Sequence, residues 1–278
     1  MPERPRPPRK PRAALPDRHV LYQKAVQAPD TDIDFVDSRF RRLRGRTAAR
    51  LREDFCGTAL TCCEWVRRRR TNTAVGLDLH QPTLDWGQRH NIAKLIPHAA
   101  ARLKLLRRDV LRPGPGARGM DAILAMNFSW WTFRTRRDLL AYFRAVRRSL
   151  VRDGAFVLDI YGGYEAQAEV RERTQIGGKQ RGFTYIWDEE LFEPITQRTR
   201  CHIDFKLRDG RRMNRAFAYD WRLWSIPETR DVLADAGFKR TIVYWEGEDG
   251  KGGGDGAFRP ATRGECCASF IAYIVALK

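Results

Sequence analysis

Between residues 47 and 163, short apolar runs alternate with longer amphipathic stretches, and this alternation restricts the possible folds more than any other feature of the sequence. The apolar runs predict five buried strands, at 48–54, 72–79, 103–106, 121–127 and 154–163. Apolar residues at helical spacing predict helices at 58–70, 81–95 and 134–154. Strands that alternate with helices form parallel sheets through right-handed crossovers. The sequence therefore predicts an α/β fold with helices on both faces of a mostly parallel sheet.

A different pattern follows the fifth predicted strand. Strand-like segments at 183–189, 198–207 and 215–224 are joined by polar stretches, one of which contains the Asp-Gly hairpin signal. We interpret residues 163–222 as an antiparallel β insertion that forms a lid over the substrate. Beyond it, the sequence predicts a helix at 227–238, strands at 239–247 and 266–277, and a flexible Gly-rich hairpin tip at 247–260.

The N-terminal segment differs in composition from the rest. Residues 1–18 contain six prolines and six basic residues. Such a segment cannot bury apolar area, so we expect a disordered basic Pro-rich tail before a single domain at 19–278, which opens with helical pieces. The sequence has no apolar run of about 18 residues and no apolar signal-peptide segment. We therefore expect a cytoplasmic protein without a membrane partner.

The formal net charge of +18 raises the question of an acidic partner. Arginine supplies 43 of the 52 basic residues and lysine only 9, a skew that genomic base composition explains as well as a nucleic-acid surface does. Arg67–Arg70 end a predicted helix, where cations also suit the helix dipole. The six cysteines lack the spacing of a zinc site, and we predict no metal.

Four of the predicted parallel strands are followed directly by polar or glycine-containing segments. The carboxyl ends of parallel strands meet at one edge of a sheet, where ligands of such folds bind. A glycine lets the backbone approach a ligand, and an acid about 20 residues later can accept the hydroxyls of a ribose. We therefore expect one site formed by residues 53–59, Asp78, Asp109-Val110 and 127–131.

These segments resemble the class I S-adenosylmethionine-dependent methyltransferases, over residues 45–162 by motif and 225–278 by topology. The resemblance implies a Rossmann-like sheet with an antiparallel last strand, and S-adenosylmethionine as the cofactor. Glu53 takes the acidic place of the family's first motif, and its three glycine places hold Phe55, Gly57 and Ala59. A dinucleotide-binding Rossmann enzyme is the competing interpretation. The two missing glycines and the order of the C-terminal elements count against it.

The resemblance also assigns the cofactor contacts. Gly57 and Thr58 would face the methionine part of the cofactor, and Asp78 would hold the ribose. Asp109 and the Val110 amide would bind the adenine, beside Leu79 or His80, while Asn127 and Phe128 would lie near the transferred methyl group. The predicted cofactor-binding residues are thus Glu53, Phe55, Cys56, Gly57, Thr58, Asp78, Leu79, Asp109, Val110, Asn127 and Phe128.

The acceptor site is predicted from the chemistry of methyl transfer. An in-line transfer needs an aligned nucleophile and exclusion of water, whereas a general base is optional. Asn127 and Ser129 are candidates to orient the nucleophile, and Tyr161 to hydrogen-bond or deprotonate it. Aromatic faces attract a sulfonium or an amine. The predicted acceptor-binding residues are Tyr22, as an entry lid, and Trp130, Trp131, Trp221 and Trp224.

The sequence thus favours a methyltransferase, monomeric or homodimeric, that acts on an N or O atom of a small molecule. In the family, an antiparallel insertion of this kind roofs a small-molecule site. An RNA or DNA methyltransferase is the first alternative, although the segment at 127–130 lacks the two prolines typical of base-methylating enzymes. A non-catalytic binding module of the same fold is the second, since Phe55 and Ala59 replace glycines.

Overall fold

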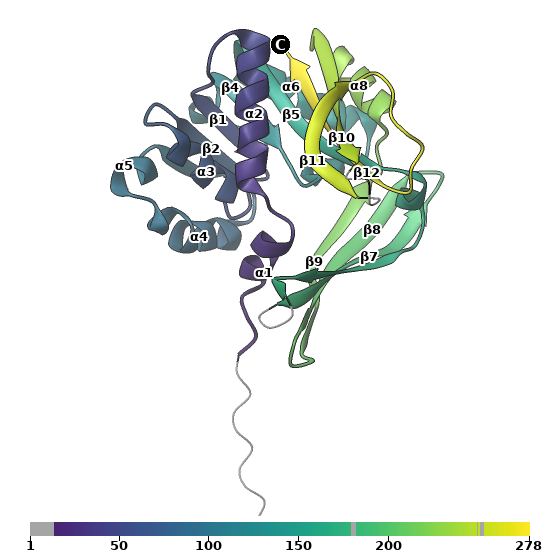
Figure 1. Cartoon of the computed structure of the whole chain (residues 1–278). Coiled ribbons are helices and arrows are strands. Elements are labelled where there is room, and N and C mark those ends of the chain that lie inside the picture. Colours follow the sequence, from purple (N-terminus) through teal and green to yellow (C-terminus); the bar gives the residue numbers. More distant parts are fainter. Residues whose placement is uncertain (1–13, 179–181, 249, 251–252) are drawn as a thin grey trace, which may run out of the picture.

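An eight-stranded mixed sheet forms the centre of the protein, and a computed structural model describes residues 14–178, 182–248, 250 and 253–278 (Figure 1). The strand order is β11-β10-β12-β5-β4-β1-β2-β3. The first five strands are mutually parallel, and β12 lies antiparallel between β5 and β10. The expected Rossmann-like sheet is confirmed. Its strands are β1 (Arg50–Asp54), β2 (Thr73–Asp78), β3 (Leu103–Arg107), β4 (Met120–Ala125), β5 (Leu150–Gly162), β10 (Arg240–Glu248), β11 (Gly254–Ala261) and β12 (Phe270–Leu277).

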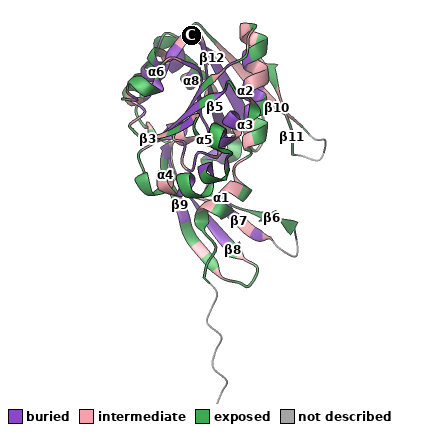
Figure 2. Ribbon diagram, turned by 90° about the vertical axis from the view of Figure 1, so that its left-hand side faces the viewer, coloured by how far each residue is buried: buried purple, intermediate pink, exposed green. Residues whose placement is uncertain are grey.

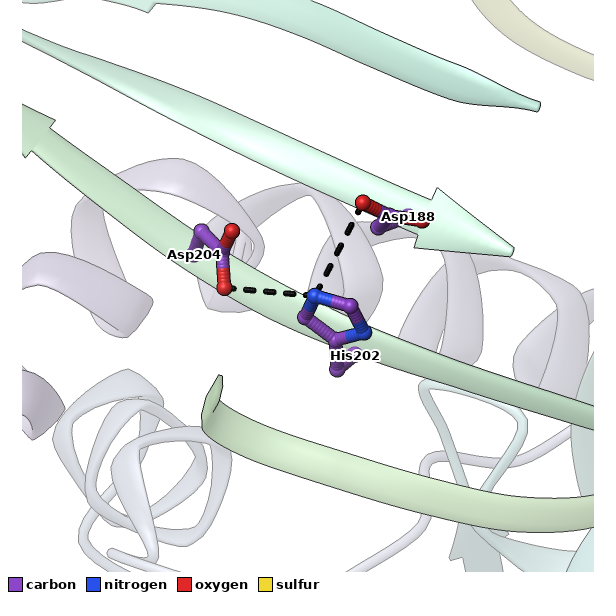
Figure 3. Close-up of side chains that lie close together, drawn as sticks. All are labelled: Asp188, His202 and Asp204. Atoms are coloured by element: carbon purple, nitrogen blue, oxygen red, sulfur yellow. Dashed lines mark ion pairs between the residues drawn. The ribbon is translucent and has the colours of Figure 1, made fainter. Parts of the chain in front are cut away.

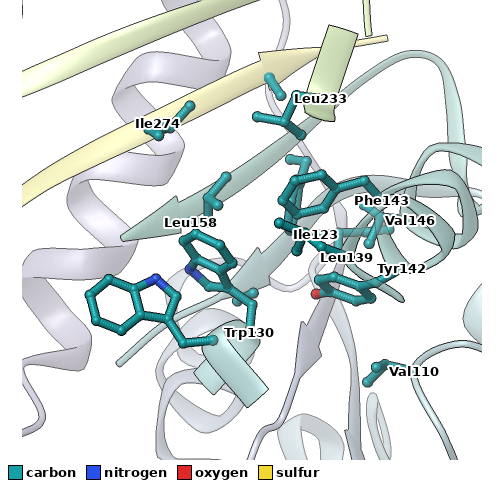
Figure 4. Close-up of a cluster of buried hydrophobic side chains, with 14 of the residues drawn as sticks. Val110, Ile123, Trp130, Leu139, Tyr142, Phe143, Val146, Leu158, Leu233 and Ile274 are labelled. Atoms are coloured by element: carbon teal, nitrogen blue, oxygen red, sulfur yellow. The ribbon is translucent and has the colours of Figure 1, made fainter. Parts of the chain in front are cut away.

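Helices cover both faces of this sheet because its strands are apolar on both sides. Along β5, Phe156 and Leu158 share one buried cluster with α6 and α8, while Ala155 and Val157 share another with α2 and α3. Figure 4 shows the first cluster, and Figure 2 shows buried residues concentrated in the sheet. The helices are α1 (Arg18–Ala25), α2 (Pro29–Arg44), α3 (Leu60–Arg68), α4 (Gln81–His90), α5 (Pro97–Ala100), α6 (Arg136–Ser149) and α8 (Ile226–Asp235), with short 3-10 turns η1 (Ile92–Lys94), η2 (Pro115–Ala117), η3 (Ser129–Thr132) and η4 (Tyr164–Gln167).

The chain between β5 and α8 forms a second, four-stranded antiparallel sheet, which extends away from the first one in Figure 1. Three of its strands correspond to the segments expected from the sequence. The edge strand β6 was not expected, because its sequence is almost entirely polar and an edge strand needs little apolar surface. The strands are β6 (Arg171–Ile176), β7 (Phe183–Glu193), β8 (Arg198–Leu207) and β9 (Arg212–Arg222).

The boundaries of two irregular segments differ from the expectation. Residues 1–13 of the expected tail lie outside the described residues, whereas Asp17 caps α1, which already begins at Arg18. The Gly-rich segment at 247–260 contains most of β11, whose Phe258 ring stacks 4.3 Å from Tyr273. A few apolar side chains are enough to bring a glycine-rich segment into the sheet. No helix among the described residues is long and apolar enough to span a membrane.

Candidate functional site

The loop between β1 and α3 keeps the backbone shape of a glycine-rich turn with only one glycine. Phe55, Gly57 and Ala59 have φ angles of +58°, +51° and +57°. These are the three positions at which the sequence resemblance placed the family's glycines. A left-handed backbone costs a residue with a side chain about 1–2 kcal/mol, so neighbouring contacts must hold this loop in place.

Side chains from three directions hold the loop. The Gly57 N–H donates to Asp78 Oδ2 at 2.9 Å, and the other carboxylate oxygen of Asp78 accepts from the His80 N–H at 2.8 Å. Asn91, which is buried, donates from Nδ2 to the Thr58 carbonyl at 2.8 Å. Gln23 of α1 donates to Thr58 Oγ1 at 2.8 Å. The acid at the end of β2 therefore holds the backbone of the first loop.

Gly87 of α4 packs directly against this loop, and its replacement by alanine is expected to disturb the loop. A Cβ at Gly87 would lie 2.5 Å from the Thr58 carbonyl oxygen. Alanine gains about 1 kcal/mol in helix propensity, but overpacking against backbone costs about 1–3 kcal/mol. We expect a lower melting temperature and weaker binding of S-adenosylhomocysteine.

The control for this change is Gly116→Ala, because a Cβ at Gly116 would meet nothing within 4 Å. Thermal melts and calorimetric titrations of both variants provide the measurement. Equal behaviour of the two variants would contradict the proposed packing role of Gly87.

Two of the predicted cofactor residues lie beneath the loop. Glu53 is only 4% exposed and accepts the Cys62 N–H at the start of α3 at 3.2 Å. Cys56 is buried as well, and its N–H donates to the Leu77 carbonyl at 2.9 Å. The structure therefore places both residues where they support the loop from below, with little surface of their own toward a ligand.

The remaining adenine-side candidates differ in exposure. Leu79 is 64% exposed, which is unusual for a leucine and leaves an apolar surface beside Asp78. Asp109 Oδ1 accepts the Leu111 N–H at 2.9 Å in a tight turn. The Val110 side chain is buried in the core. If Val110 contacts an adenine, it must therefore do so through its backbone amide.

The loop after β4 is strained in the same way and is held by a residue that the sequence analysis missed. Asn127 and Phe128 have φ angles of +57° and +56°. Their N–H groups donate to the two carboxylate oxygens of Asp159, at 2.6 and 2.9 Å. Burial raises the pKa of Asp159 to about 7. An acid in the middle of an apolar strand was the available signal, because buried carboxylates need dedicated partners.

Helix α1 connects the cofactor loop to the second sheet. Besides the bond from Gln23 to Thr58, Asp17 accepts from Trp86 Nε1 of α4 at 2.7 Å. On its other side, the Tyr22 ring lies 4.8 Å from the Phe217 ring of β9. The Tyr22 and Tyr219 hydroxyls share a hydrogen bond, and burial raises the pKa of Tyr22 to about 12. Tyr22 therefore packs against β9 of the second sheet, and its predicted role as an entry lid stays a prediction.

A cavity of about 510 Å³ opens between the two sheets, next to the loop after β4. Its volume falls within the range of small-molecule sites. Four of the predicted catalytic or acceptor-binding residues line it, Tyr22, Asn127, Tyr161 and Trp221, and so does Phe128, which was predicted to bind the cofactor. Four aromatic lining residues were not predicted, namely Tyr185, Trp187, Tyr219 and Phe270, and Trp245 of β10 also lines the cavity.

Three predicted acceptor-binding tryptophans do not line the cavity. Trp130 and Trp131 are fully buried in the core, and Trp130 Nε1 donates to the Asp159 carbonyl at 2.9 Å (Figure 4). Trp224 is 2% exposed and donates to the Phe133 carbonyl. Burying these rings removes much apolar surface from water. The structure therefore gives them a packing role in place of the predicted substrate contact.

Ser129 also differs from its predicted role. Its hydroxyl donates to the Met126 carbonyl at 3.0 Å, within the turn that begins η3. The residue is absent from the cavity lining. Ser129 thus stabilises the turn that carries Asn127 and Phe128, and its hydroxyl is not aimed at a nucleophile.

Tyr161 lies in a buried hydrogen-bond network with Glu189 of β7. The Tyr161 hydroxyl donates to Glu189 Oε1 at 2.9 Å, and Trp187 Nε1 donates to the same oxygen at 3.1 Å. Burial raises the pKa of the Tyr161 hydroxyl well above its usual value and also raises the pKa of Glu189. The Tyr161 hydroxyl therefore donates to Glu189 in this structure, and its predicted role of hydrogen-bonding or deprotonating the nucleophile stays a prediction.

Carboxylates dominate the charge of the cavity, although the whole chain is strongly basic. No Lys, Arg or His belongs to the described residues that line it. Six glutamates do: Glu165, Glu172, Glu189, Glu246, Glu248 and Glu265.

A second group of charged residues lies in the inserted sheet away from this cavity. His202 Nε2 lies 3.7 Å from Asp188 and 3.3 Å from Asp204 (Figure 3). Arg171 forms ion pairs with the same two aspartates, at 2.9 and 2.8 Å. A guanidinium already balances these carboxylates, so the group is explained as an ion-pair network that ties β6 to β7 and β8.

The free energy of unfolding is expected to fall as the pH rises from about 5 to about 7, because buried acids at the site are protonated in the folded state at the lower pH. Burial raises the pKa of Glu53 from 4.5 to about 7. Between those values the folded state binds a proton that the unfolded state has lost, so the contribution favours folding at low pH and is lost through about pH 7. Glu53→Gln, which keeps a carbonyl acceptor for the Cys62 N–H, should flatten the dependence.

Urea unfolding at about pH 5 and about pH 8, without cofactor, measures this effect. Relative to wild type, the Gln variant should gain stability at the higher pH. If the free energy of unfolding changes by the same amount in both proteins between the two pH values, Glu53 is ionised in the folded state throughout.

Comparisons with known proteins give the same fold. The sequence matches no known family profile and no curated protein. A solved S-adenosylmethionine-dependent methyltransferase from Clostridium acetobutylicum is 16% identical, with a TM-score of 0.65 over 92% of this chain and 96% of that one. An amino pentose methyltransferase from Micromonospora echinaspora, solved with S-adenosylmethionine, is 18% identical, with a TM-score of 0.65 over 95% and 99%. A sugar N-methyltransferase from a Streptoalloteichus species is 16% identical, with a TM-score of 0.63 over 100% and 99%. The chain thus has the fold of class I S-adenosylmethionine-dependent methyltransferases.

Proposed function

We propose that this protein binds S-adenosylmethionine and transfers its methyl group to a nitrogen or oxygen atom of a small acceptor. One observation carries the proposal: the cavity reaches Asn127 and Phe128, on the same sheet edge as the loop at 55–59 and Asp78. A cofactor along that edge would present its methyl group to a molecule in the cavity.

The residues at the sheet edge suit this cofactor. Each oxygen of the Asp78 carboxylate accepts one backbone N–H and keeps a further lone pair, which a ribose hydroxyl can use. The exposed Leu79 offers an apolar face to an adenine. Gly57 and Thr58 would contact the methionine part. The cofactor supplies an activated methyl group on a sulfonium.

The protein's own part is alignment and exclusion of water. A lone pair on the acceptor N or O forms the new bond to the methyl carbon, while the carbon–sulfur bond breaks and its electrons remain on the neutral thioether. The backbone at Asn127 and Phe128 is fixed by Asp159 and forms the wall nearest this reaction. The Tyr161 hydroxyl would orient the acceptor, and the Glu189 carboxylate would take the proton that the nucleophile releases.

The two alternatives have less support. A nucleic-acid substrate would need a basic groove, whereas the described lining of the cavity is acidic. Arg67, Arg68 and Arg69 of the candidate basic run form ion pairs with acids on α2 and α3. A non-catalytic module was suggested by the missing glycines, but the loop retains their backbone angles.

Calorimetric titration with S-adenosylmethionine and S-adenosylhomocysteine tests the proposal directly. We expect saturable binding of both, and release of S-adenosylhomocysteine when small amines or alcohols are supplied. Absence of binding for both compounds would refute the cofactor assignment. Binding without turnover of any acceptor would instead support the non-catalytic module.

A further inference from the structure

We propose that the acceptor is an amine carrying at least two ammonium groups. This inference rests on the proposed function, because it names the substrate class of the same cavity. It follows from two groups of carboxylates and aromatic rings in the cavity lining, one on the inserted sheet and the other on and beside β10 and β12. We call them the insertion wall (Glu172, Trp187, Glu189, Tyr219 and Trp221) and the β10 wall (Trp245, Glu246, Glu248, Glu265 and Phe270).

The carboxylates of both walls lack counter-ions among the described residues. None of the six lining glutamates takes part in an ion pair with any of the described residues, although Asp and Glu elsewhere pair with arginine repeatedly. In a chain with a net charge of +18, unpaired acids gathered in one cavity are unusual. A ligand with positive charge would supply the missing partners.

Glu189 gives the insertion wall its strongest demand for a cation. Glu189 is only 5% exposed, and its Oε1 accepts both of the hydrogen bonds that described side chains donate to this carboxylate. No described residue donates to Oε2. A buried carboxylate with one unpartnered oxygen is costly unless a cation or donor completes it. An ammonium in the cavity would do so.

The aromatic rings of this wall suit the same group. Tyr219 and Trp221 stack at 4.3 Å, and the Trp187 ring lies 6.1 Å from that of Tyr219. Ring faces attract ammonium ions through cation–π contacts. The insertion wall also joins Tyr161, whose ring lies 4.8 Å from Phe128. The nitrogen held here would be the one that is methylated, after it loses a proton to expose its lone pair.

The β10 wall forms a second site of the same chemistry on the main sheet. The Trp245 and Phe270 rings lie 4.4 Å apart, on neighbouring strands β10 and β12. Glu246 and Glu248 follow on β10, and Glu265 precedes β12. The two walls come from different sheets, β10 from the eight-stranded sheet and β7 and β9 from the four-stranded one, and we assign a separate ammonium to each. The second wall would hold a non-reacting ammonium and set the length of the substrate.

The test uses a series of linear diamines from diaminobutane to diaminooctane. Each is compared with the amino alcohol of the same chain length, which has one ammonium fewer. Each diamine and each amino alcohol is titrated into protein loaded with S-adenosylhomocysteine and into cofactor-free protein, and its affinity is measured. At least one diamine should bind about tenfold more tightly than its amino alcohol, the equivalent of about 1.4 kcal/mol. The difference should shrink as salt is added.

The double variant Glu246→Gln, Glu248→Gln locates the second ammonium. It should remove most of the preference for the diamine, whereas Glu169→Gln, at an exposed residue outside the lining, should retain it. Melting curves check that each variant is folded. If no diamine binds more tightly than its amino alcohol, or if the double variant keeps the full preference, the inference is overturned. Because binding of S-adenosylhomocysteine is measured separately, that result leaves the proposed methyltransferase function standing.

Discussion

Replacing Asp78 with alanine is expected to weaken binding of S-adenosylhomocysteine about 100-fold. The variant would lose an acceptor for the ribose hydroxyls, and hydrogen bonds to a charged group contribute about 1.5–3 kcal/mol each. It would also release the Gly57 and His80 N–H groups, so the strained loop at 55–59 would lose one of its anchors. Calorimetric titration at fixed salt measures the change.

Two further variants separate the causes of this loss. Asp78→Asn keeps one carbonyl oxygen for the loop but removes the charge, and should fall between wild type and alanine. Asp85→Ala on the neighbouring helix α4 removes an acid whose partner is Gln81, and should leave cofactor affinity unchanged. Unaltered affinity in Asp78→Ala would refute the placement of the ribose at the end of β2.

Replacing Arg52 with methionine is expected to lower the free energy of unfolding by about 3–5 kcal/mol. Arg52 and Asp54 form an ion pair at 2.8 Å within β1, and both side chains are fully buried. The same aspartate accepts the Tyr142 hydroxyl of α6, and Arg52 donates to the Ala117 carbonyl. Removing the guanidinium would leave a buried carboxylate without its charge partner. Urea unfolding measures the loss.

A double variant and a surface control test the physical reason. Arg52→Met with Asp54→Leu removes both charges, and should recover much of the stability lost by the single variant. Arg67→Met breaks the exposed pair with Glu64, and should change stability by at most about 1 kcal/mol. Equal losses in the single and double variants would show that packing, and not the unpaired charge, is responsible.

Much of the cofactor side of the site could be predicted from the sequence. Gly57, Asp78 and Asn127 follow predicted strands, and the register of a parallel sheet brings strand ends together. The resemblance to the family assigned two glycine places of the first motif to Phe55 and Ala59, and both residues adopt the left-handed backbone that favours glycine. A local pattern is sufficient here because the loop conformation is a local property.

The acceptor side could not be predicted in the same way. Trp130 and Trp131 were predicted to contact the acceptor but are buried in the core, whereas Tyr185 and Trp187, which were not predicted, line the cavity. Sequence patterns do not tell which face of a turn will meet the core. The polar strand β6 gave no apolar signal at all, because it pairs at an edge.

The sequence by itself determined the α/β class, the succession along the chain of the strands that carry the predicted cofactor residues, and the presence of an antiparallel insertion. It could do so because apolar periodicity and strand-end chemistry are short-range patterns. Only the tertiary structure decided which side chains act together. It paired Asp159 with a loop 32 residues away, and Tyr161 with Glu189, 28 residues away. It also gathered glutamates from both sheets into one cavity, where none of them forms an ion pair with the described residues. The first contact depends on the pairing of β4 with β5, and the other two depend on how the two sheets face each other. Residues far apart in the chain meet in each case, which short sequence patterns do not determine.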